Sequence, residues 1–373
     1  MMAQLKVLEL FSGIGGMHLA LKESQISASI VAAVDINTAA NAVYKHNFPG
    51  TKLLQRNIEA LTAKEIENLQ PDMIVLSPPC QPFTRRGKQE GLADSRSMAL
   101  IHFMELIPKL WGVRYVLLEN VVGFESSVAC KELVQILQEN LFETQQFHLC
   151  PTQFHIPNSR KRFYLLAKRK PWKFQFETTK LEEELPVDVG ISAGCEPRPA
   201  CEPLHSLNSK YTHMVESSDQ CFQLSKVLEQ LQPEERAAHA VPDKLLERYV
   251  YETDFVIPDD VGSCCFTKAY RRFFHGSGSV LTDCSRKQFF ETFDQVDTKV
   301  RPMSPEHVSN VRSIGPRFFT PREIMRLMGF PEDFTFPSHA SVRQASAMLG
   351  NSINVHVVAL LILYLTEGDL ILD

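Results

Sequence analysis

Residues 5–16 read LKVLELFSGIGG, an apolar β-rich run followed directly by a glycine-rich turn. The run Leu5–Leu10 predicts a buried strand, and the glycines predict a tight turn at its carboxyl end. Apolar runs of the same kind recur at 29–34, 73–77, 113–118 and 162–168, with helical patterns between them at 37–48, 97–110 and 128–140. Strands that alternate with helices indicate an α/β fold, and nearly continuous apolar strands indicate a parallel sheet covered on both faces.

The composition changes near residue 177. Residues 177–260 contain 18 acidic and 7 basic residues, so we expect an acidic insertion that is partly flexible. Residues 261–300 predict a compact, irregular β region. The segment Thr320–Glu323 combines a capping Thr, a first-turn Pro and a Glu, which predicts a helix start, and a final helix follows residue 352. We therefore divide the chain into residues 1–176, 177–318 and 319–373, and expect the last part to return to the first.

Composition excludes several classes of protein. The longest near-apolar run, Val355–Leu365, is shorter than the roughly 20 residues that a membrane span needs, and we expect no signal peptide before the first strand. The nine Cys show no paired ligand spacing, so we expect no metal site, no disulfides and a reducing compartment. The net charge is −5, yet outside residues 177–260 the chain has 26 acidic and 32 basic residues. Nucleic acid is therefore not excluded as a partner, and its binding should be salt-sensitive.

Four successive predicted strands end in residues that can carry chemistry. The first ends in the glycine turn, the second in Asp35, the third just before Cys80 and the fourth in Glu119. Each has an ordinary structural explanation, such as a tight turn, a free thiol or a solvated carboxylate. Because strand ends of parallel sheets meet at one edge, together they predict a ligand cleft. A basic triplet, Arg160–Arg162, opens the next strand and could hold a base edge or a phosphate, or simply face solvent.

Details of these motifs limit the class of ligand that the predicted cleft could bind. Asp35 could accept both hydroxyls of a ribose, whereas His18 occupies the third glycine position of the dinucleotide fingerprint, which favours a nucleoside without pyrophosphate. Two prolines fix the backbone before Cys80, and Arg85 and Arg86 follow it. The thiol could therefore be a stabilised thiolate nucleophile.

Taken in order, these motifs resemble those of the cytosine carbon-5 methyltransferases. The resemblance covers the whole chain and rests on Phe11–Gly16, Ser77–Phe83, Glu119–Val121, Arg160–Arg162, Thr320–Glu323 and Gly350–Ser352. It implies a Rossmann-like α/β sheet that binds S-adenosylmethionine, with a smaller target-recognition domain. Residues 1–176 would then form the catalytic domain, residues 177–318 the acidic insertion and target-recognition domain, and residues 319–373 the returning helices.

The resemblance also implies roles for individual residues. The catalytic residues would be Cys80, Glu119, Arg160 and Arg162. The cofactor-binding residues would be Phe11, Gly13, Ile14, Gly15, Gly16, Asp35, Ile36, Asn57, Ile58, Ser77, Asn351 and Ser352. The substrate-binding residues would be Arg85, Arg86, Asn120, Cys265, Phe266, Thr267 and Lys268. Bacterial relatives carry an Asp at the position of Asn57, so it stays open which of Asn57, Ile58 and Glu59 contacts the cofactor adenine.

The segment Cys265–Lys268 resembles the recognition region of one subgroup, the DNA-methyltransferase-like enzymes that methylate position 38 of aspartate tRNA. We therefore expect a monomeric tRNA methyltransferase of the cytoplasm or nucleus, which acts through a covalent Cys80 adduct and needs no metal or membrane. A DNA methyltransferase of low activity and a catalytically silent nucleic-acid-binding protein remain as alternatives. Because Cys80, Glu119, Arg162 and Asp35 are all present, the silent protein is disfavoured.

A second region could contact nucleic acid. Basic residues alternate with aromatic ones over Phe266–Phe274, where Lys268, Arg271 and Arg272 lie among four rings. Such a patch suits a folded RNA, because bases stack on rings while cations meet phosphates. The alternative is a surface hairpin over a small satellite core.

Overall fold

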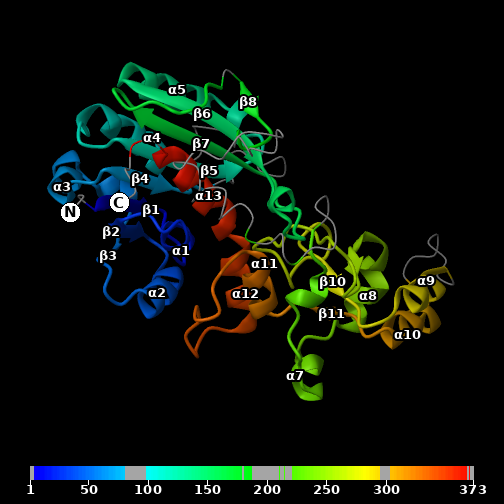
Figure 1. Cartoon of the computed structure of the whole chain (residues 1–373). Coiled ribbons are helices and arrows are strands. Elements are labelled where there is room, and N and C mark those ends of the chain that lie inside the picture. The colour runs from blue at the N-terminus through cyan, green and yellow to red at the C-terminus, as the bar shows by residue number, and fades with distance from the viewer. Residues whose placement is uncertain are drawn as a thin grey trace. The chain divides into compact units, whose positions relative to one another are not determined.

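The computed structural model describes residues 4–79, 98–178, 180–186, 210, 214, 221–294, 303–367 and 369. The chain forms two compact units (Figure 1). The first comprises residues 1–153, 161–210 and 353–373, and the second comprises residues 154–160 and 211–352. Each unit is thus built from segments that are far apart in the sequence.

The first unit is built on an eight-stranded sheet with the strand order β3-β2-β1-β4-β5-β7-β6-β8. Its strands are β1 (Leu5–Leu10), β2 (Ala28–Asp35), β3 (Leu53–Gln55), β4 (Met73–Leu76), β5 (Tyr115–Val121), β6 (Phe142–Leu149), β7 (Arg162–Arg169) and β8 (Leu181–Glu182). The predicted α/β sheet and its five predicted strands are confirmed. Strand β1 pairs in parallel with β2 on one side and with β4 on the other, so the carboxyl ends of these three strands lie at one edge.

One expectation about the sheet is wrong. The sequence predicted parallel strands throughout, but β7 runs antiparallel to both β5 and β6. The polar strand β6, with the sequence FETQQFHL, lacks the apolar run by which the other strands were predicted. Because β7 runs backwards, its first residue, Arg162, lies opposite Val121 at the end of β5. A residue at the start of a strand thereby reaches the carboxyl edge.

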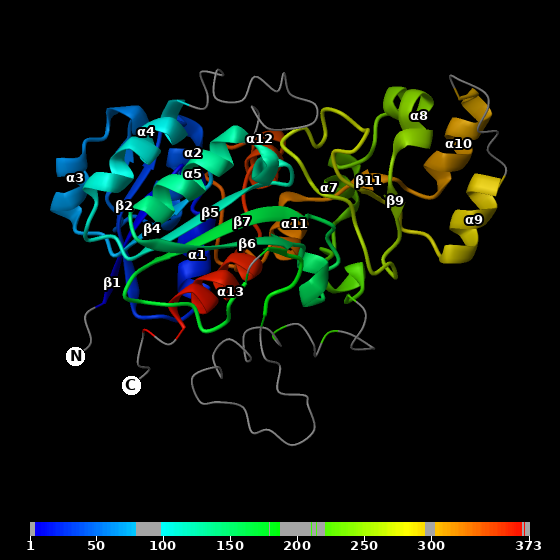
Figure 2. The same ribbon diagram turned by 90° about the horizontal axis from the view of Figure 1, so that it is seen from above.

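Helices cover both faces of this sheet. They are α1 (Gly16–Glu23), α2 (Thr38–Asn47), α3 (Ala63–Leu69), α4 (Met98–Leu106), α5 (Val128–Glu139) and α13 (Val355–Thr366). Figure 2 shows α4 and α5 on one face, with α1 and α13 on the other. The stretch Val342–Thr366 is long and apolar enough to cross a membrane, but 83% of its most apolar window is buried. Every residue of α13 is buried, as in a core helix that packs on α1.

The second unit contains a three-stranded sheet in the order β11-β10-β9, with β9 (Phe255–Val256), β10 (Val280–Leu281) and β11 (Arg317–Phe318). Its helices are α7 (Pro233–Ala238), α8 (Asp243–Tyr249), α9 (Arg286–Asp294), α10 (Pro305–Ser313), α11 (Pro321–Leu327) and α12 (Val342–Gly350). The predicted helix start at Thr320 is confirmed, because Thr320 and Glu323 form a reciprocal capping box. The predicted β region at 261–300 also contains helix α9, whose pattern the sequence analysis missed.

The units divide the chain differently from the expected parts. Helices α11 and α12 belong to the second unit, whereas only residues from Ile353 onward belong to the first. Glu323 of α11 explains part of this arrangement, since it is fully buried and accepts hydrogen bonds of 2.8 and 2.7 Å from Arg317 of β11. Strand β8, within the expected insertion, extends the large sheet beside β6.

Candidate active site

The glycine turn at the end of β1 adopts backbone conformations that its sequence anticipates. Phe11, Gly13 and Gly15 have φ angles of 54°, 53° and 92°, in the left-handed region that glycine adopts most easily. An added Cβ at Gly15 would lie 2.4 Å from the ring of Phe48. Nothing lies within 4 Å of the equivalent position at Gly13. The turn is therefore closely packed at Gly15 and open at Gly13.

Asp35 holds this turn in place. Its Oδ2 accepts a hydrogen bond of 2.8 Å from the backbone N–H of Gly13, and its Oδ1 accepts one of 2.7 Å from Asn37. Each carboxylate oxygen can accept a second hydrogen bond, so the carboxylate retains capacity for a ligand hydroxyl. The next residue, Ile36, leaves 65% of its surface exposed and offers an apolar face beside that carboxylate.

The other residues that were predicted to bind the cofactor differ in how exposed they are. Asn57 caps a short helical turn, and its side chain accepts a hydrogen bond of 3.3 Å from the backbone N–H of Glu59. Ile58 is buried beneath it. Ile14 is buried behind the glycine turn, and Gly16 begins α1. The exposed Ile36 is thus the apolar side chain at this edge that a planar ligand could cover.

Glu119 lies in a polar cluster at the same edge of the sheet. It belongs to β5 and is 6% exposed. Ser77, just after β4, donates a hydrogen bond to its Oε2, and the Nε of Arg162 lies 3.5 Å from its Oε1. Neighbouring strands β4, β5 and β7 each contribute one member. The antiparallel β7 therefore brings an Arg to a Glu that is 43 positions earlier in the chain.

Asn120 occupies a structural position rather than an accessible one. Its side chain is buried and donates a hydrogen bond of 3.4 Å to the carbonyl of Pro78, and it accepts one of 2.9 Å from Val121. It thereby ties β5 to the start of the loop that leads to Cys80. The predicted residues Cys80, Arg85 and Arg86 lie outside the described residues.

Arg160 is not in this cluster, contrary to the sequence-based prediction. It is 3% exposed and lies in the second unit. Its guanidinium donates to the carbonyls of Phe266 (3.0 Å), Gly350 (3.2 Å) and Ser352, and to the Sγ of Cys265 (3.3 Å). In this structure Arg160 therefore joins two backbone segments.

The segment Cys265–Lys268 is partly buried by the same contacts. Phe266 is 1% exposed and packs edge-on against Tyr270 and Phe319, so it is a core residue rather than a substrate contact. The backbone N–H of Thr267 donates to Ser277, whereas Lys268 is exposed. Asn351, predicted to bind cofactor, is also exposed.

The basic and aromatic residues of the segment Phe266–Phe274 fall into a buried group and an exposed group. Phe266, Tyr270 and Phe274 are buried, as the satellite-core alternative predicts. Arg272 and Phe273 are exposed, and the guanidinium carbon of Arg272 lies 5.3 Å from the centroid of the Phe273 ring. The surface part retains the pairing of cation and ring.

The sequence analysis missed a buried network behind the glycine turn. Glu9 of β1 is fully buried, its Oε2 accepts a hydrogen bond of 2.8 Å from Tyr44, and Tyr44 lies 2.9 Å from Nδ1 of His18. Burial raises the pKa of Glu9 to about 8, and burial lowers the pKa of His18 to about 4. Strand β1 reads LKVLEL and carries both Lys6 and Glu9, so no local pattern marked Glu9 as the buried one.

No group of three or more His, Cys, Asp or Glu side chains that could hold a metal ion occurs among the described residues. The described cysteines 130, 150, 221, 264, 265 and 284 are free thiols. The described groups around Glu119 are its carboxylate, the Ser77 hydroxyl and the Arg162 guanidinium.

Comparison with known proteins shows the family. The family model for C-5 cytosine-specific DNA methylase matches residues 5–365. The chain is 39% identical to a Bos taurus protein named tRNA (cytosine(38)-C(5))-methyltransferase, over 98% of this chain and 100% of that protein. It is 32% identical to a Dictyostelium discoideum protein named DNA (cytosine-5)-methyltransferase, over 99% and 96%.

Comparison with solved structures indicates the same family. A crystal structure of a Spodoptera frugiperda DNMT2 mutant superposes with a TM-score of 0.82 at 36% identity, over 98% of this chain and 100% of that one. Similarity in sequence and in structure therefore extends over nearly the whole chain. The protein belongs to the C-5 cytosine-specific DNA methylase family.

Proposed function

We propose that this protein transfers a methyl group from S-adenosylmethionine to carbon-5 of a cytosine in tRNA, and that the cytosine is position 38 of aspartate tRNA. The cluster of Ser77, Glu119 and Arg162 carries the proposal, since it places a buried acid and a cation at the edge where the glycine turn and Asp35 also lie. The Bos taurus relative supports the choice of RNA through the substrate in its name.

The residues at this edge fit the proposed cofactor. The open space at Gly13 admits a ligand close to the backbone, and Asp35 has capacity for ribose hydroxyls. The exposed face of Ile36 suits a purine ring. Gly13, Asp35 and Ile36 would therefore hold the cofactor, which when bound supplies an electrophilic methyl group on a sulfonium.

The chemistry of the base requires a nucleophile, because carbon-5 of cytosine is itself a poor one. In the proposed reaction the Sγ of Cys80 forms a bond to carbon-6, and the electron pair of the 5,6 double bond becomes available at carbon-5. Glu119, in its protonated form, donates to ring nitrogen 3 and stabilises the developing negative charge. After carbon-5 accepts the methyl group, a solvent water takes the proton from carbon-5; the C–H electron pair re-forms the 5,6 double bond and the bond to Sγ breaks, which releases the Cys80 thiolate.

Ser77 and Arg162 position the acid for this step. The Ser77 hydroxyl occupies one oxygen of Glu119, while Arg162 lies beside the other. Arg162 would also contact the cytosine oxygen or the ring edge as the base enters. A base in an anticodon loop is already poorly stacked, so its extrusion costs little free energy.

Methyl transfer from labelled S-adenosylmethionine tests the proposal. Purified protein is given total tRNA, an aspartate tRNA transcript, the same transcript with uridine at position 38, or duplex DNA, and Cys80→Ala serves as the control variant. We expect label on aspartate tRNA and none on the uridine transcript or with Cys80→Ala. Label on DNA alone would overturn the choice of RNA, and equal transfer by Cys80→Ala would overturn the covalent mechanism.

A further inference from the structure

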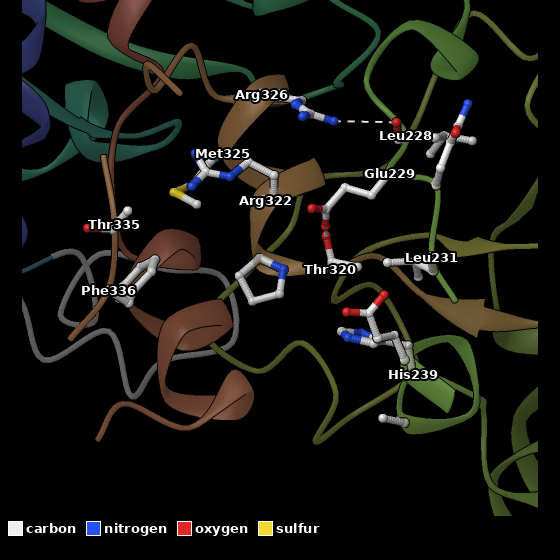
Figure 3. Close-up of a pocket in the computed structure, with 14 residues that line it drawn as sticks. Leu228, Glu229, Leu231, His239, Thr320, Arg322, Met325, Arg326, Thr335 and Phe336 are labelled. Atoms are coloured by element: carbon white, nitrogen blue, oxygen red, sulfur yellow. Dashed lines mark hydrogen bonds between the residues drawn. The ribbon is translucent and has the colours of Figure 1, made fainter. Parts of the chain in front are cut away.

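A cavity of about 820 Å³ lies within the second unit and takes no part in the reaction described above (Figure 3). Four segments line it: residues 228–231, one face of α7, the first turn and a half of α11, and residues 335–336. Its volume falls in the range of small-molecule and cofactor sites. The cavity is therefore large enough for a nucleotide.

Two arginines that line this cavity, Arg322 and Arg326, share the carboxylate of Glu332. Arg326 binds Glu332 through Nε (2.7 Å) and Nη2 (3.2 Å). Arg326 also donates to the carbonyls of Val227 and Leu228, which fixes the loop against α11 (Figure 3). Arg322 stays 4.0 Å from Glu332, at the limit of an ion pair.

The Nη1 of Arg322 is removed from solvent and has no hydrogen-bond partner among the residues that the structure describes. Arginine donates five hydrogen bonds, and a buried donor that makes none is costly. The side chain as a whole is 20% exposed and lines the cavity. Because Nη1 is enclosed by protein, a ligand in the cavity would contact the exposed part of the Arg322 side chain instead.

The apolar residues that line the cavity favour a planar ligand beside Arg322. Leu228, Leu231 and Phe336 are half-buried, and Met325 closes the interior. Phe336 packs edge-on against Phe334, with ring centroids 5.9 Å apart, which holds its ring in place. RNA bases outside a helix stack on such rings and on arginine planes.

The other polar groups of the lining match a base better than a simple anion. Glu229 accepts a hydrogen bond from Thr320, and Glu235 accepts one of 3.0 Å from Gln232 at the start of α7. Both carboxylates would repel an inorganic phosphate but could accept from an amino or imino group. His239 is neutral at pH 7, because burial lowers its pKa to about 4, and Arg271 contacts its Nδ1. Its Nε2 therefore carries a proton and is a donor.

We propose that this cavity binds one nucleotide of the RNA substrate, other than the target cytosine. Arg322 contacts the phosphate of this nucleotide, and the ring of Phe336 covers its base. The site rests on the proposed function, since an RNA substrate is its source of nucleotides. It would give the second unit a direct part in selecting the substrate.

Binding and crosslinking of an aspartate tRNA anticodon stem-loop test this site in the full-length protein. The variants are Arg322→Ala and Phe336→Leu, with Arg312→Ala as the matched control, because Arg312 is an exposed arginine of α10 that does not line the cavity. Loss of a phosphate contact should raise the Kd of Arg322→Ala about tenfold and make the slope of log Kd against log salt shallower by roughly 0.7. KM should rise while kcat stays unchanged.

Photocrosslinking identifies the position directly. Stem-loops that carry 4-thiouridine at single positions outside the target should crosslink to residues 320–336 in the wild type, and Phe336→Leu should abolish this crosslink. An unchanged Kd and salt slope in Arg322→Ala, or crosslinks that map elsewhere, would overturn the site. If the wild type methylates no RNA, the proposed function fails; if it does but Arg322→Ala behaves as Arg312→Ala, the site alone fails.

Discussion

Arg160 and Arg162 are two positions apart in one motif, yet they serve different units of the molecule. Arg160 is buried in the second unit and donates to three carbonyls and a thiol. Arg162 begins β7 in the first unit and lies beside the buried acid Glu119. The comparison teaches that residue type and motif position do not predict which groups an arginine contacts. The place of each residue in the fold decides its contacts, since Arg160 meets backbone carbonyls and Arg162 meets a carboxylate.

Replacing each arginine with alanine tests the contrast between Arg160 and Arg162 most directly. Arg160→Ala leaves three carbonyls without their buried donor, and we expect it to lower the free energy of unfolding by about 3 kcal/mol or more. Arg162→Ala should leave stability within about 1 kcal/mol and lower methyl transfer roughly 100-fold, because it removes the charge beside Glu119. Urea unfolding and single-turnover transfer measure the two effects. A stable but inactive Arg160→Ala would place that residue in the reaction after all.

Gly350 tests how tightly the two backbone segments that Arg160 joins are packed together. A Cβ at this position would lie 2.1 Å from the carbonyl carbon of Thr267 and 2.4 Å from the nitrogen of Lys268, and backbone cannot give way as a flexible side chain can. We expect Gly350→Ala to cost about 2–3 kcal/mol of unfolding free energy. Gly262→Ala is the control, since nothing lies within 4 Å of its added Cβ. Equal melting temperatures for the two variants would show that the contact is not tight.

Glu9 tests the buried network behind the cofactor turn through its pH dependence. The pKa of Glu9 is about 8 in the folded protein, against 4.5 for a solvated glutamate. Between pH 4.5 and 8, Glu9 is therefore ionised in the unfolded chain and protonated in the folded protein. Stability should therefore fall as pH rises from about 4.5 to 8, and the Glu9→Gln variant should not show this loss. We expect Glu9→Gln to be more stable by on the order of 2 kcal/mol at pH 7.5, with no difference at pH 4.5. A difference that is the same at both pH values would contradict the assignment.

The smallest expected effect concerns Ser77. Ser77→Ala removes the hydroxyl that donates to Glu119 and leaves Arg162 in place. We expect kcat to fall about fivefold, because one hydrogen bond contributes roughly 1 kcal/mol, with little change in the melting temperature. Rescue by Ser77→Thr would support a positioning hydroxyl, whereas full activity of Ser77→Ala would show that Arg162 alone orients the acid.

Much of the first unit could be predicted, because its signals are local. The apolar runs of β1, β4 and β5 and the glycine turn depend on neighbours a few positions away, as does the capping box of Thr320 in the second unit. Asp35 and Glu119 could be placed at one edge since parallel strands end together. The polar strand β6 and the buried acid Glu9 lacked such a signal, as their environment is supplied by distant segments.

The sequence by itself determined the α/β pattern, the motif order and, through their resemblance, the methyltransferase family. Only the tertiary structure decided the direction of β7, the burial of Arg160 and Phe266, and the assignment of α11 and α12 to the second unit. The physical reason is the range of the interactions. Periodicity and turn conformation act over a few residues, whereas the direction of β7 depends on its pairing with the separate strands β5 and β6. The partner of a buried charge can lie much further away, as Arg160 and Gly350 show.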